Sequence, residues 1–82
     1  MIMVIVMKRL RDLREDKDLT QQDIAKLLHC SQTTYSRYET GNSNIPIDAL
    51  QKLAIFYNTS IDYIIGLTEE KRAYKYTTSI KK

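Results

Sequence analysis

The sequence predicts an all-α domain of five short helices around a single hydrophobic core. Apolar residues recur at helical spacing in successive segments, and residues that favour helix starts and ends stand between those segments. The 82 residues include only two glycines and one proline, which argues against a loop-rich chain, and this length suits one domain.

The first two helices are expected from Met7 to Lys17 and from Gln21 to Leu28. The first has a narrow apolar stripe between charged residues, which is typical of a surface helix. The second follows Thr20, and Asp23 stands three residues later, which makes a capping box with aspartate in place of glutamate. The apolar positions of the two helices are Leu10, Leu13, Ile24, Ala25, Leu27 and Leu28.

The third helix is expected from Gln32 to about Thr40. Ser31 can cap its start, and Gly41 is the left-handed residue expected at its end. Tyr35 and Tyr38 are expected to face the core. Only three residues separate the second and third helices.

Two further helices follow the loop GNSNIP. Pro46 suits the entry to a fourth helix, IDALQKLAIFY, and Asn58 is placed to end it. Ser60 can cap a short fifth helix, IDYIIG, which stops at Gly66. The helical domain is therefore expected to span residues 7–67.

The two ends of the chain lie outside this helical pattern. Residues 1–6, MIMVIV, are apolar on both faces and would be an aggregation hazard if they were left exposed. Residues 68–82 form a basic tail, in which AYKYTTSI alternates with the period of a strand. We hypothesise that the ends pair as antiparallel strands, within one chain or between two, and contribute to a dimer interface. The alternative is that residues 1–6 are an upstream start that remains disordered.

Composition narrows the class of protein. Cys30 is the only cysteine, so no internal disulfide can form, and a cytoplasmic location is expected. The opening MIMVIVM is too short for a bilayer that needs about 20 apolar residues, so no membrane partner is expected. Residues 21–66 carry three basic and four acidic side chains, a net charge of −1, although the whole chain is formally +3. Any anion bound by this central segment must be held by a few cations and by backbone donors.

No catalytic or metal site is expected. His29 and Cys30 are adjacent, but a zinc site needs four ligands and the chain has no second histidine or cysteine. A cysteine nucleophile needs a base across a pocket, whereas Cys30 falls in a turn that packs inward. We also expect no cofactor, and the chain offers no obvious site for a small-molecule ligand.

Two short helices joined by three residues, the second with a polar outer face, form a helix-turn-helix. The stretches LREDKDLTQQDIAKLL, SQTTYSRYETG, IPIDALQKLA and NTSIDYIIGLT occur in the order and spacing of a known family. The chain therefore resembles the Xre/Cro-type helix-turn-helix family of phage repressors and bacterial regulators, over about residues 7–68. This resemblance implies a five-helix, phage-repressor-like DNA-binding domain. Two positions that are usually glycine are occupied by His29 and Asp18, and His29 is expected to strain the turn without changing it.

The resemblance also implies roles for individual residues. The outer face of the third helix takes the family's base-reading positions, where arginine can bind guanine and glutamine can bind adenine through paired hydrogen bonds. Helix starts and polar loop residues take the phosphate-contacting positions. A matching arginine–glutamate pair is expected to tie the reading helix to the first helix. The base contacts are Gln32, Thr33, Ser36 and Arg37. The phosphate contacts are Gln21, Ser31, Thr34, Asn42, Ser43 and Asn44, and the ion pair is Arg14 with Glu39.

The expected function is that of a sequence-specific transcriptional regulator, in particular a repressor that binds a two-fold operator on double-stranded DNA as a homodimer. One reading helix covers only a few base pairs, so two are needed for affinity and specificity. The alternative is an antitoxin-like protein-interaction module whose main partner is another protein.

Overall fold

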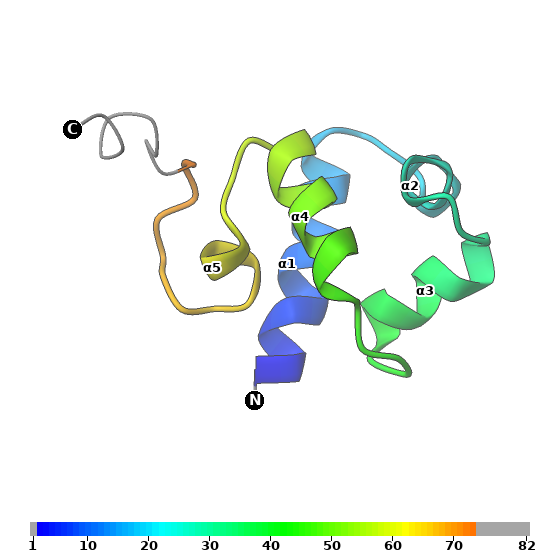
Figure 1. The fold of residues 1–82 in the computed structure, drawn as a ribbon, viewed down its shortest axis with the longest axis horizontal. Coiled ribbons are helices and arrows are strands. Elements are labelled where there is room, and N and C mark those ends of the chain that lie inside the picture. The colour runs from blue at the N-terminus through cyan, green and yellow to red at the C-terminus, as the bar shows by residue number, and fades with distance from the viewer. Residues whose placement is uncertain (1, 74–82) are drawn as a thin grey trace.

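The computed structural model describes residues 2–73, with side chains from residue 4 onward, and it contains five helices and no strand within that range (Figure 1). The all-α fold class is therefore confirmed. The helices are α1 (Ile2–Asp16), α2 (Gln21–Leu28), α3 (Gln32–Thr40), α4 (Ile47–Phe56) and α5 (Ile61–Ile64).

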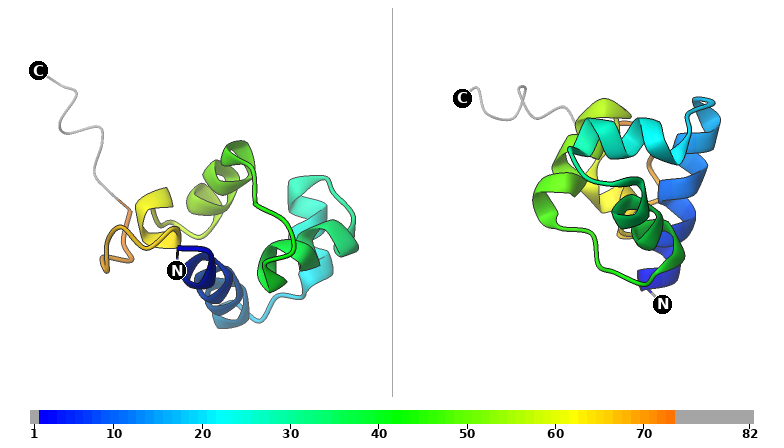
Figure 2. Two further views of the ribbon diagram at one scale, coloured as in Figure 1. Left: turned by 90° about the horizontal axis from the view of Figure 1, so that it is seen from below. Right: turned by 90° about the vertical axis from the view of Figure 1, so that its right-hand side faces the viewer.

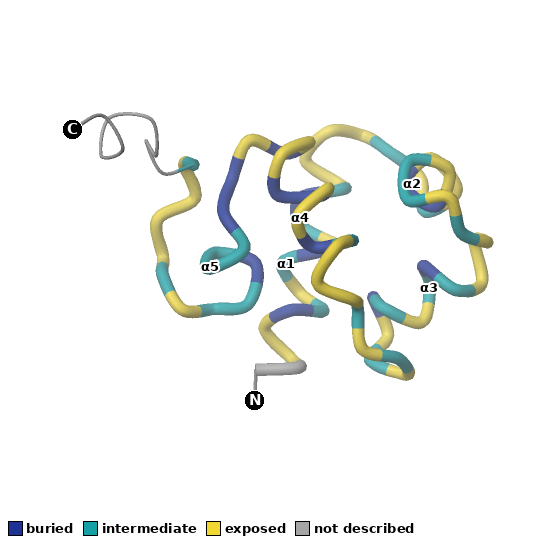
Figure 3. The backbone as a smooth tube through the Cα atoms, viewed as in Figure 1, coloured by how far each residue is buried: buried dark blue, intermediate teal, exposed yellow. Residues whose placement is uncertain are grey.

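The helices surround one core. Figure 1 shows α1 and α4 in the middle, with α2 and α3 on one side and α5 on the other, and the two views in Figure 2 keep α2 and α3 together beside α1. Figure 3 shows the buried residues gathered in the middle of the domain. Tyr35 of α3 is the largest fully buried side chain. The other fully buried large side chains are Leu10, Ile24, Leu53 and Ile64.

Helix α1 begins at Ile2, five residues earlier than expected. The strand hypothesised for residues 1–6, and the disordered alternative, are therefore both wrong over the described residues 2–6. The physical reason is burial: Val6 is 8% exposed and lies on the same face of the helix as Leu10 and Leu13. Residues 74–80, the hypothesised partner strand, lie outside the described residues.

The helix ends follow local capping chemistry. Thr20 Oγ1 accepts from the Asp23 amide at 3.0 Å and the Thr20 amide donates to Asp23 Oδ2 at 2.9 Å, which is the expected capping box. The hydrogen bond that the Thr20 amide donates to the Asp23 carboxylate lowers the pKa of that carboxyl. Ser31 and Ser60 cap α3 and α5 with one hydrogen bond each, which the serine side chain accepts from the amide three residues later.

Left-handed residues end two of the helices. Gly41 follows α3 with φ +83°, and a Cβ at this position would lie only 2.6 Å from Met7 Sδ, so α1 packs directly against it. His29 follows α2 with φ 58°, as expected for a histidine in a position that favours glycine. Asp18 is also left-handed, with φ 57°. Neither departure from glycine prevents the turn, so α2 and α3 keep the helix-turn-helix arrangement.

Candidate nucleic-acid interface

Helix α3 has one buried side and one polar, outward side. Tyr35 and Glu39 are buried, whereas Gln32, Thr33 and Arg37 are exposed. The outward residues belong to a shallow concave surface, which we call the α3 surface and which also takes in the start of α2 and the loop after α3. Its residues are Gln21, Gln32, Thr33, Ser36, Arg37, Thr40 and Asn42.

All four expected base-contacting residues thus lie together on the α3 surface, with two of the six expected phosphate-contacting residues beside them. Thr40 is the member that sequence reasoning missed. The sequence contains the signal for it: Thr40 stands three residues after Arg37 and four after Ser36, so it lies on the same face of the helix as both. Its hydroxyl donates to the Arg37 carbonyl at 3.4 Å.

The other four expected phosphate contacts lie elsewhere. Ser31 Oγ accepts from the Thr34 amide at 3.1 Å and donates to Thr34 Oγ1 at 2.9 Å, so these two side chains pair with each other at the start of α3. Ser43 and Asn44 line a separate depression of about 320 Å³, together with apolar residues such as Val6. The structure therefore divides the expected phosphate contacts into three groups.

The loop after α3 is closed by its own backbone. The amides of Asn42 and Ser43 donate to the Arg37 carbonyl at 2.9 and 3.3 Å. Because these two amides are already used, the donors that Asn42 and Ser43 can offer to a ligand are in their side chains.

A buried carboxylate holds α3 to both neighbouring helices. Glu39 Oε2 lies 2.7 Å from Arg14 Nε, and Glu39 Oε1 lies 3.1 Å from Arg14 Nη2, so the expected ion pair is formed and is bidentate. The carboxylate also accepts from Tyr35 Oη at 2.6 Å and from Gln21 Nε2 at 3.1 Å. One side chain thereby connects α1, α2 and α3.

The charge state of this cluster follows from its contacts. Burial by itself raises the pKa of Glu39. The hydrogen bonds from Arg14, Tyr35 and Gln21 together lower it by more than burial raises it, so the pKa of Glu39 lies below its usual value. The carboxylate is therefore ionised at neutral pH. Glu39 holds one amide hydrogen of Gln21, and the second amide hydrogen remains for another acceptor.

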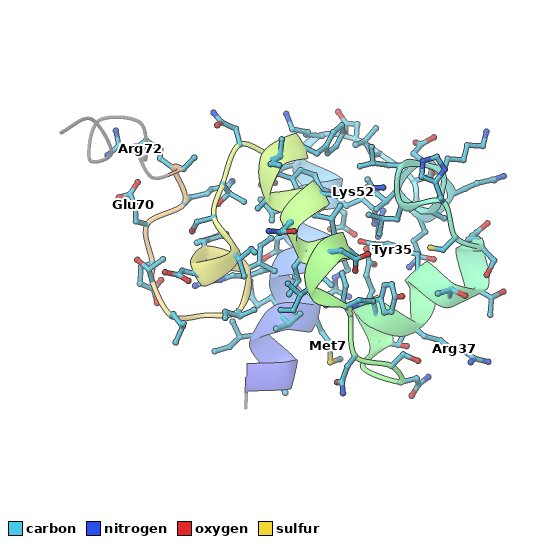
Figure 4. The ribbon with its side chains drawn as sticks, in the orientation of Figure 1. Met7, Tyr35, Arg37, Lys52, Glu70 and Arg72 are labelled. Atoms are coloured by element: carbon cyan, nitrogen blue, oxygen red, sulfur yellow. The ribbon has the colours of Figure 1, made fainter. Side chains whose placement is uncertain are left out.

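Arg37 is the cation of the α3 surface. Figure 4 shows its side chain extending from α3 away from the core, opposite in direction to Tyr35. Within residues 2–73 no carboxylate forms an ion pair with Arg37. An exposed guanidinium without a carboxylate partner, among hydroxyl and amide groups, can bind an acceptor from outside the chain.

Within residues 2–73, no group of three or more His, Cys, Asp or Glu residues could hold a metal ion. None of the described helices has the length and apolar character needed to cross a membrane.

The helix pair, its cluster at Glu39 and its polar outer face define a helix-turn-helix domain. Comparison with known proteins agrees, because the model of the helix-turn-helix family matches residues 10–64. The chain belongs to this family, in its Xre/Cro-type branch.

Several bacterial and phage proteins are similar to this domain. The chain is 38% identical over 63 residues to the uncharacterized HTH-type transcriptional regulator YobD of Bacillus subtilis (strain 168), covering 77% of the chain and 56% of the relative. It is 30% identical over 73 residues to the cryptic phage CTXphi transcriptional repressor RstR of Vibrio cholerae, covering 89% and 66%. It is 32% identical over 59 residues to the antitoxin PezA of Streptococcus pneumoniae serotype 4, covering 72% and 37%. The chain thus spans less than two thirds of the length of these relatives.

Proposed function

We propose that the protein is a sequence-specific DNA-binding regulator of transcription that places α3 in the major groove. The α3 surface carries this proposal, because it combines short hydrogen-bonding side chains with an arginine that has no ion-pair partner within residues 2–73, on a helix that fits the groove. Gln32, Thr33, Ser36 and Arg37 are the proposed base contacts.

Phosphate contacts would fix α3 in the groove. Gln21 stands at the start of α2, where the helix dipole attracts anions, and its second amide hydrogen is available to a phosphate oxygen. The remaining proposed phosphate contacts are Ser31, Thr34, Asn42, Ser43 and Asn44.

We further propose a homodimer that represses transcription from a two-fold operator. One α3 reads only a few base pairs, and two copies about 34 Å apart would supply the missing affinity and specificity. The repressor role is supported by the likeness to RstR, which is named as a phage repressor. A cytoplasmic location belongs to the same proposal, because a regulator of transcription acts in the compartment that holds its DNA.

Selection of bound duplexes from random DNA tests this function. We expect enrichment of two similar half-sites related by a two-fold axis, with centres about 10 base pairs or a multiple of that apart. A chain that enriches no sequence at low salt would contradict the proposal.

The second candidate is an antitoxin-like module, which the likeness to PezA favours. In that case the chain would copurify from its source with a second protein in fixed stoichiometry. Tight binding of the isolated chain to the selected duplex, with no such partner, would decide for the first candidate.

A further inference from the structure

Arg11 lies on the stripe of α1 that faces the end of α3. Met7, Arg11 and Arg14 follow one another at helical spacing of four and three residues, so they share one face. Met7 packs against Gly41, and Arg14 forms the ion pair with Glu39. Since both neighbours on the stripe contact the end of α3, Arg11 must lie beside it.

A second observation agrees with this position. Arg11, Met7 and Lys8 line one shallow depression together with Glu39 of α3. The α3 surface reaches the same end of the helix through Thr40 and Asn42. Arg11 therefore stands at the edge of the α3 surface, on a helix to which no DNA contact has been assigned.

Arg11 also differs from the other cations of α1 in its charge environment. Lys8 pairs with Asp12 at 2.7 Å, Arg9 with Glu69 at 3.3 Å, and Arg14 with Glu39 at 2.7 Å. Arg11 is exposed and forms no ion pair within residues 2–73.

The nearby Glu39 does not neutralise Arg11. Its carboxylate is buried and already accepts four hydrogen bonds, from Arg14, Tyr35 and Gln21. The edge of the α3 surface therefore carries a guanidinium that forms no ion pair with a carboxylate of residues 2–73.

We propose that Arg11 binds a phosphate of the DNA strand that flanks α3, so that α1 extends the DNA contact beyond α2 and the loop after α3. A guanidinium is suited to this role because it can donate two parallel hydrogen bonds to phosphate oxygens. Arg11 supplies charge where the central segment, residues 21–66, has a net charge of −1. This proposal rests on the proposed DNA-binding function.

The test compares Arg11→Gln with Lys52→Gln. Each change removes one positive charge, and Lys52 is likewise exposed and unpaired among the described residues, but it lies on α4, well apart from Arg37 in Figure 4. Affinities for the selected duplex and for an unrelated duplex are measured by fluorescence anisotropy over a series of salt concentrations.

For Arg11→Gln we expect the affinity for both duplexes to drop by about threefold to tenfold. The negative slope of log K against log salt should become less steep by about 0.9, which is the value for one lost phosphate contact. Arg11→Lys should restore most of that slope, and Lys52→Gln should keep the wild-type slope. Equal melting temperatures of the two glutamine variants would exclude a folding effect.

Other results would overturn the proposal. If Arg11→Gln has the same slope as Lys52→Gln while Arg37→Ala still weakens binding to the selected duplex, Arg11 has no phosphate contact and the proposed function stands. If the wild-type chain binds neither duplex at low salt, the function and the contact both fall.

Discussion

Tyr35 Oη donates a hydrogen bond of 2.6 Å to Oε2 of Glu39, one turn further along α3. Both residues are buried, and the same carboxylate binds Arg14 of α1 and Gln21 of α2. The helix that presents Arg37 outward is therefore attached to two neighbouring helices through its inward face.

Tyr35→Phe should lower the free energy of unfolding by about 1.5 to 3 kcal/mol, because it removes a hydrogen bond to a charged acceptor and leaves the ring in place. Tyr38→Phe is the matched control, since the Tyr38 hydroxyl has no hydrogen bond to the described residues. Its effect should stay within about 0.5 kcal/mol. Urea denaturation gives both values, and equal effects would mean that the Tyr35 hydroxyl does not stabilise the fold.

Glu39→Ala should destabilise the protein by about 3 kcal/mol or more, because it leaves the Arg14 guanidinium buried without its partner. The Arg14 side chain is only 13% exposed. Removing Arg14 and Glu39 together should cost less than Glu39→Ala alone. A denaturation double-mutant cycle measures the coupling, and additive losses would show that the two residues act independently.

Stability should depend on pH through Glu39. Its pKa is lowered in the folded protein, so its contribution is complete above the usual glutamate pKa of about 4.3 and is lost as the pH falls through the folded value. The difference in unfolding free energy between wild type and Glu39→Gln should therefore be constant near neutral pH and shrink below about pH 4.5. Asp23 and Glu70 also have lowered pKa values, but both residues are present in the wild type and in Glu39→Gln, so their contributions cancel in this difference. Urea titrations from pH 3 to 7 test this, and a difference that does not change with pH would refute it.

Base and phosphate contacts should respond differently to substitution. Arg37→Ala and Gln32→Ala should each weaken binding to the selected duplex by about 1 to 3 kcal/mol and hardly change binding to unrelated DNA. Gln21→Ala should weaken binding to both duplexes about equally, because a phosphate contact does not depend on base identity. Anisotropy titrations on the two duplexes distinguish the roles. Equal losses on both duplexes for Arg37→Ala would remove it from the base contacts.

The N-terminal part of α1 should contribute to stability through one of its two described valines. Val6→Ala should cost about 1 to 2 kcal/mol, because Val6 is 8% exposed and its truncation leaves a cavity. Val4→Ala is the control on the same helix, since Val4 is 61% exposed and should change stability by less than about 0.5 kcal/mol. Thermal or urea unfolding compares them, and no loss for Val6→Ala would mean that this turn does not pack on the core.

The sequence alone determined the helices whose ends depend on local chemistry. Thr20, Ser31 and Ser60 each accept a hydrogen bond from an amide three residues later, and Gly41 adopts the left-handed conformation directly after α3. Such interactions join close neighbours in the chain, so their residue types predict them without knowledge of the fold. Helical spacing likewise predicted which side chains share the outer face of α3.

Only the tertiary structure decided the form of the N-terminal segment and the partners of distant residues. MIMVIV is apolar on both faces, so its sequence shows neither the helical nor the strand period, and the helical form of residues 2–6 depends on the burial of Val6 against the core. Glu39 binds Gln21, which is 18 positions away in the chain, and Arg14, which is 25 positions away. Arg11 lines a depression with Glu39 because α1 packs against α3. These contacts depend on how the helices cross, and the crossing is set by side chains from the whole core, which local spacing does not encode.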